Sequence, residues 1–219
     1  MKKLVAAVAT VLLVLPFAAS AQFPSLPKGL PSVPGLPGGG SSGGGDAING
    51  QNDALVRGYV AANKDVLLAN AQMAAALGLK DAAATARATA DALTDGATKG
   101  NLEDSNKAVS ASTDAVSAEM AKGPKLDAAA KQKYSKGMAQ LGQGVLRYIA
   151  LAGPAQSFSS SLKNASPMML PKLQAGIYVA SQLPTGLSNL STSMKSASAF
   201  AKSNDIPVPP DATKAMAAL

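Results

Sequence analysis

The chain has 219 residues, a formal net charge of +7 at pH 7, and no cysteine, histidine or tryptophan. Without cysteine there is neither a disulfide framework nor a thiol nucleophile, and without histidine the usual general base and the commonest ligand of zinc and copper are missing. These absences exclude most hydrolase triads, thiol enzymes and structural zinc sites. We therefore expect a protein that is not an enzyme and holds no cofactor.

The first 21 residues have the order of a secretory signal peptide. Two lysines precede an uncharged apolar run over residues 4–17, and small residues follow it. The run is shorter than the ~20 residues that a membrane-spanning helix needs, so cleavage is favoured over a membrane anchor. Ala19 and Ala21 fit the small-x-small rule, which makes Gln22 the first mature residue. The expected location is the bacterial periplasm or the exterior, with no transmembrane segment after cleavage.

Residues 22–45 contain five prolines and eight glycines, which predicts a disordered linker without a packed core. Regularly spaced proline favours extended polyproline II backbone, and the glycine-rich end favours flexible coil. A spacer is the favoured interpretation. The alternative is a proline-rich segment that docks in an aromatic groove, and a spacer does not require the apolar side chains that the segment carries, namely Leu26, Leu30, Val33 and Leu36.

Residues 46–219 predict one helical domain. Ala, Leu, Ser and Lys dominate there, glycine and proline fall at intervals of roughly one helix, and no interval alternates like a strand. The predicted fold class is all-α, a five- to six-helix antiparallel bundle preceded by the disordered Pro/Gly-rich arm. The first helix is expected to begin at Asp46 or Asn52 and to end before Gly78.

The apolar arc of this first helix covers nearly half of its circumference, which predicts neighbours on two sides. Asn52, Asn63 and Asn70 lie at one edge of the arc, so at least one of them is expected to be buried. Interhelical hydrogen bonding that sets the register of the bundle is the favoured interpretation. A polar site inside the bundle is the alternative.

The following helices are expected from Asp81, which would cap an alanine-rich segment, from about Asn101 to Ala121, and from Asp127 to Ala152. The last of these has the clearest pattern, with apolar residues such as Tyr134 on one face and lysines on the other. Further segments are expected around Phe158 and from near Pro167. Pro184 is expected to start or kink a last long helix, and the C-terminal residues to add a weak final turn.

Three weak chemical motifs are better explained by composition. Ser160 and Lys163 have the spacing of a Ser–Lys nucleophile pair, but no second motif supports them. Asp91 and Asp95 resemble part of a calcium loop, but leucine stands at two ligand positions. The methionines could bind Cu(I) through their sulfur atoms, but most of them fall on apolar stripes where methionine fills space.

Charge is distributed unevenly along the chain. Residues 22–121 carry seven Lys and Arg against ten Asp and Glu, whereas residues 122–219 carry eleven against three. Lys133, Lys136 and Arg147 lie opposite the apolar face of their helix, where they could bind an anionic envelope lipid, a polysaccharide or an acidic protein. With aromatics at 4% and no stacking pattern, nucleic acid is not expected as a partner.

The sequence therefore predicts an exported, non-enzymatic helical bundle that binds a partner or an anionic component of the cell envelope, with the N-terminal arm as a flexible tether. The alternative is a periplasmic carrier that holds a lipid or another apolar ligand within the bundle. Helix interfaces rich in alanine and glycine, which could separate at low cost, favour the carrier.

Overall fold

The computed structural model describes residues 44–219. The predicted signal peptide with its cleavage site, and all but the last two residues of the predicted Pro/Gly-rich arm, lie outside the described residues. The domain boundary predicted at residue 46 falls inside the first helix, which begins at Gly44.

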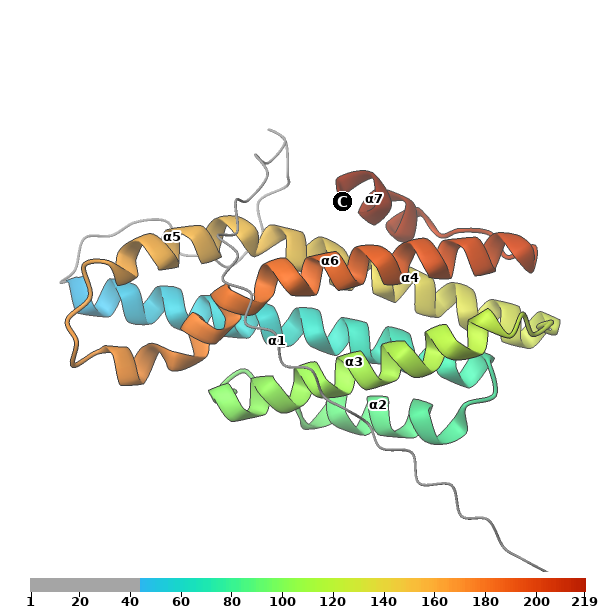
Figure 1. The fold of residues 1–219 in the computed structure, drawn as a ribbon, viewed down its shortest axis with the longest axis horizontal. Helices are drawn as coiled ribbons and strands as arrows, with labels where there is room; N and C mark the ends of the chain where they lie inside the picture. Colours follow the sequence, from blue (N-terminus) through green and yellow to red (C-terminus); the bar gives the residue numbers. More distant parts are fainter. Residues whose placement is uncertain (1–43) are drawn as a thin grey trace, which may run out of the picture.

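The described residues form an all-α bundle, which confirms the predicted fold class (Figure 1). Six α-helices have eleven residues or more, and a nine-residue helix ends the chain. The elements are α1 (Gly44–Ala76), α2 (Lys80–Ala92), α3 (Lys99–Ala121), α4 (Ala128–Ala150), α5 (Ala152–Leu162), the 3-10 helix η1 (Leu170–Leu173), α6 (Gln174–Ser203) and α7 (Pro210–Ala218).

Helix α1 is the centre of the bundle. It contacts α2, α3, α4, α5 and α6, and Figure 1 shows it running through the middle of the molecule. Its buried residues cover more than half of its circumference, among them Leu55, Val60, Leu67 and Ala69. The wide apolar arc in the sequence thus corresponds to a helix that has neighbours on several sides.

Helices α1 and α4 run antiparallel and approach closely at two glycines of α4. A Cβ atom added at Gly137 would lie 2.7 Å from Cγ of Met73, and one added at Gly144 would lie 2.9 Å from Cγ2 of Val66. Both distances are shorter than a van der Waals contact, so the packing requires residues without a side chain at these positions. The apolar residues of α4 are buried as well, including Tyr134 and Met138.

Pro184 lies inside the continuous helix α6, which agrees with the expected kink and not with the expected helix start. A proline within a helix removes one backbone donor and bends the helix without necessarily ending it. Figure 1 shows that α6 bends along its length. The two segments expected on either side of Pro184 are therefore a single element of 30 residues.

The ends of two further helices also differ from expectation. Asp81 lies in the first turn of α2, whose N-cap is Leu79 without a side-chain hydrogen bond, so Asp81 is not the cap. The C-terminal segment is a packed helix, because Ala212 and Ala215 of α7 are fully buried against the bundle. In the part of the chain that the structure describes, no helix has the length and hydropathy to cross a membrane.

Candidate functional site

The three asparagines singled out on α1 are all buried, with 8%, 0% and 2% of Asn52, Asn63 and Asn70 exposed. Each has a protein partner on another helix. The backbone N–H of Gly176 on α6 donates to Oδ1 of Asn52 at 2.9 Å. The other two amides bind side chains of α3, and all three thus have the hydrogen bonds that buried amides require.

Asn63 and Asn70 form a two-step polar ladder with α3. Nδ2 of Asn63 donates to Oγ of Ser105 at 3.0 Å, and Nδ2 of Asn70 donates to Oγ of Ser112 at 2.9 Å. Ser105 and Ser112 are buried. Both pairs repeat after seven residues on both helices, so α1 and α3 run parallel in a fixed register.

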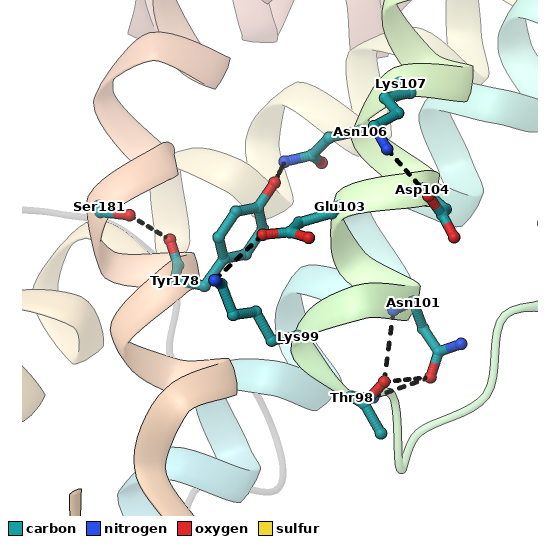
Figure 2. Close-up of polar contacts among 9 residues, drawn as sticks. All are labelled: Thr98, Lys99, Asn101, Glu103, Asp104, Asn106, Lys107, Tyr178 and Ser181. Carbon is teal, nitrogen blue, oxygen red and sulfur yellow. Dashed lines mark hydrogen bonds and ion pairs between the residues drawn. The ribbon is translucent and has the colours of Figure 1, made fainter. Parts of the chain in front are cut away.

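A cluster of tyrosine and asparagine side chains extends this ladder toward α4 and α6. Asn106 lies at its centre, where its Oδ1 accepts hydrogen bonds from Nδ2 of Asn63 at 3.0 Å and from the hydroxyl of Tyr59 at 2.9 Å. Its Nδ2 donates to the hydroxyl of Tyr178 at 2.8 Å (Figure 2). The hydroxyl of Tyr148 donates to Oδ1 of Asn63. Four helices thereby share one hydrogen-bonded network.

The tyrosines of this network stay protonated at neutral pH. Burial raises the pKa of Tyr148 well above 10, and the nearby Tyr59 raises it further. Burial also raises the pKa values of Tyr59 and Tyr178 above their ordinary value. The rings of Tyr59 and Tyr148 pack edge to face with centroids 5.3 Å apart. The network is therefore uncharged and rigid, which suits a fixed hydrogen-bonding surface.

A cleft of about 440 Å³ lies beside this network, between α3 and α6. Tyr59, Asn106 and Tyr148 contribute to its lining. Most of the other lining residues carry a hydroxyl or an amide, and of the lining residues that the structure describes Asp114 is the one with a charge. Sequence reasoning missed this cleft, because the polar residues of α3 and α6 have the pattern of ordinary solvent-exposed faces.

A larger hollow of about 780 Å³ lies where α1, η1 and the start of α3 meet. Its lining mixes both signs of charge, with Asp53, Arg57, Asp95 and Lys172. The first turn of α3 is closed by its own residues, since Thr98 and Asn101 form a reciprocal capping box (Figure 2). Those backbone donors are thus partly satisfied already, and the hollow favours no single ligand class.

The three basic residues predicted to face an anionic surface are all exposed, but they are not equivalent. Arg147 forms an ion pair with Asp65 of α1, with 2.6 Å between Nε and Oδ2. Lys133 lies with Arg87 of α2 around a hollow of about 360 Å³ that is lined mainly by alanines. Among the described residues, Arg87, Lys133 and Lys136 form no ion pair. We call Arg87, Lys133, Lys136 and Arg147 the basic face.

The weak chemical motifs are not assembled into sites. Ser160 and Lys163 are both exposed, and the Ser160 hydroxyl donates to the carbonyl oxygen of Gln156 within its own helix. Asp91 and Asp95 are exposed, and residues 44–219 contain no group of three or more acidic side chains placed to hold a metal ion. Met168 is 87% exposed in the loop before η1.

Comparison with known proteins gives no family assignment. No family model matches the chain, and neither the curated proteins nor the solved structures include a significant match to it.

Proposed function

We propose that this protein is an exported, non-catalytic binding protein that attaches to an anionic component of the bacterial cell envelope through the basic face. The observation that carries the proposal is the meeting of Arg87 and Lys133, from two different helices, around one hollow. Lys136 follows on the exposed side of α4. Cations that lack a carboxylate partner remain available to a phosphate group.

We further propose that the N-terminal segment directs export and then tethers the bundle. Cleavage after Ala21 would export a mature chain that begins at Gln22. The Pro/Gly-rich residues that follow would then serve as a tether, which lets the bundle reach a surface or a partner at a distance. N-terminal sequencing of the exported protein should read Gln-Phe-Pro, whereas retention of Met1 would refute export by cleavage.

Vesicle sedimentation tests the binding. The mature protein should bind vesicles of phosphatidylcholine and phosphatidylglycerol, and binding should weaken as added salt shortens the Debye length below ~10 Å. A triple variant Arg87→Gln, Lys133→Gln and Lys136→Gln should lose most of this binding. Arg147 is kept in the variant because its ion pair with Asp65 joins α4 to α1.

The matched control removes the same number of charges elsewhere, with Lys163→Gln, Lys172→Gln and Lys195→Gln, and it should bind nearly as well as the wild type. Equal binding by the triple variant and the wild type would overturn the role of the basic face. So would binding of the wild type to vesicles of phosphatidylcholine alone.

A carrier of an apolar ligand is the second candidate. The alanine-lined hollow beside Arg87 and Lys133 favours it, since a small apolar surface flanked by cations suits an anionic amphiphile. Native mass spectrometry of the purified protein separates the two candidates. A carrier should retain a copurified ligand of discrete mass, and a purely surface-binding protein should give the mass of the mature chain alone.

A further inference from the structure

The cleft between α3 and α6 is unlike the other hollows in its chemistry. Along α3 its lining residues include Ser110, Thr113 and Ser117, and along α6 they include Thr185 and Asn189. Its volume of about 440 Å³ lies within the range that is typical of small-molecule sites, ~300–1,000 Å³. The cleft thus has the size of a ligand site and walls made of neutral hydrogen-bonding groups.

These walls disfavour most ligand classes. Among the described residues no lysine or arginine lines the cleft, and the carboxylate of Asp114 would repel an anion. An apolar ligand would leave the hydroxyl and amide groups without partners, which costs free energy for each group that is buried. A ligand that carries donors and acceptors on several sides and has no net charge would match both walls.

The floor of the cleft is held rigidly by the tyrosine and asparagine network. Asn106 lines the cleft, and its amide is fixed by Tyr59, Asn63 and Tyr178. The Nδ2 atom of Asn106 carries two hydrogens, and it donates one of them to the hydroxyl of Tyr178. Gly186 brings the backbone of α6 close to the ring of Tyr148, since an added Cβ would lie 2.9 Å from Cε1 of that ring. A prearranged floor lowers the entropy that is lost when a ligand binds.

We propose that this cleft binds an uncharged saccharide. Sugar hydroxyls donate and accept hydrogen bonds at once, as the serine, threonine and amide side chains of the walls do. Val109 and Leu190 provide apolar surface within the lining for the C–H faces of a sugar ring. The site is separate from the basic face, so that saccharide binding neither requires nor excludes attachment to an anionic surface.

Nuclear magnetic resonance of the ¹⁵N-labelled mature protein tests this proposal, with cellotriose, maltotriose and triacetylchitotriose as probes. At least one sugar should shift the amide resonances of residues 106–117 and 182–196 saturably, with a Kd of about 1 mM or below. Asn189→Ala should weaken that binding about fivefold, the effect expected from one lost hydrogen bond. Ser110→Phe, which fills the cleft from an exposed position, should abolish it.

Ser188→Ala is the matched control, because Ser188 is an exposed residue of α6 that does not line the cleft, and it should leave the binding unchanged. Three results would overturn the proposal: no saturable shift with any of the three sugars up to about 10 mM, shifts that fall outside α3 and α6, or unchanged binding by Ser110→Phe. The Arg87, Lys133 and Lys136 variant should still bind the sugar, which keeps this test separate from that of the basic face.

Discussion

Asn63 and Asn70 stand one heptad apart on α1, and each binds a serine that is also one heptad from its counterpart on α3. Because the partners repeat together, a slip of α3 by a single residue would break both hydrogen bonds at once. Buried polar pairs of this kind cost stability when they are left unsatisfied, and they disfavour other registers. The ladder thus explains how helices rich in alanine keep one arrangement.

Replacing Asn63 with alanine should lower the free energy of unfolding by about 3 kcal/mol, because the change leaves Ser105, Asn106 and Tyr148 each short of a buried partner. Urea unfolding followed by circular dichroism measures the loss. Asn164→Ala, at an exposed position, is the control and should change the value by less than about 0.5 kcal/mol. A similar loss in both variants would contradict the structural role of Asn63.

Two glycines of the bundle should respond to alanine in opposite directions. A Cβ at Gly142 would lie 2.5 Å from the carbonyl carbon of Asp211 and 2.6 Å from the nitrogen of Ala212, so α7 would have to move. At Gly50, inside α1, an added Cβ meets no atom of residues 44–219 within 4 Å. Gly142→Ala should therefore destabilise the protein, and Gly50→Ala should stabilise it by roughly 0.5–1 kcal/mol through helix propensity.

Hydrogen exchange shows whether Gly142→Ala destabilises α7 locally or the whole bundle. Amide protection should fall first in α7, residues 210–218, while α1 keeps its protection. Equal loss of protection in α1 and α7, or no change in α7, would contradict the close contact between Gly142 and the start of α7.

The fold class followed from the sequence because its signals are local. The apolar stripe of α4 and the start of this helix at Asp127 can be predicted without knowledge of distant residues. Gly137 and Gly144 lie where α4 approaches its partner helix most closely. The identity of the partner helix, α1, depended on the tertiary arrangement and appeared only in the structure.

The candidate site was harder to predict because its members lie on different helices. Ser105 and Ser112 are typical of an exposed helix face, yet both are buried as partners of the α1 asparagines. A matching seven-residue spacing in the two segments was the available signal. The cleft between α3 and α6 left no such signal, since surface-like residues form its walls. For Pro184 the sequence left a helix start and a kink open, because proline can end a helix or bend it, and only the structure shows that it lies inside α6.

Arg147 and Lys136 should differ in their effect on stability although both are exposed. Arg147 pairs with Asp65, which is only 16% exposed, so Arg147→Gln would leave a largely buried carboxylate without its cation. We expect a loss of up to about 1 kcal/mol for Arg147→Gln and almost none for Lys136→Gln. Thermal unfolding at low and high salt checks this. High salt should reduce the difference in stability between the two variants. If it did not, the ion pair between Arg147 and Asp65 would not be the cause of that difference.

Tyr134 makes the stability of the bundle sensitive to alkaline pH. The side chain is fully buried, and its hydroxyl donates to the carbonyl oxygen of Ala197 at 3.1 Å. Burial raises the pKa of Tyr134 far above its ordinary value of 10.0. In the unfolded chain this phenol ionises near pH 10, whereas in the folded protein it stays protonated. Its contribution is therefore fully present below about pH 10 and is lost as the pH rises from there toward the raised pKa of the folded state.

The expected result is a fall in the free energy of unfolding above about pH 10, to which Tyr134 contributes about 1.4 kcal/mol per pH unit. Tyr134→Phe should be somewhat less stable at neutral pH, because it lacks the hydrogen bond to Ala197, but its alkaline slope should be shallower by that amount. Urea unfolding of both proteins from about pH 8 to about pH 11.5 measures the two slopes. Lysine ionisation affects both proteins alike, so the difference between them isolates the phenol. Parallel alkaline slopes would mean that Tyr134 ionises equally readily in the folded protein, and the burial that the structure shows would then fail to keep it protonated.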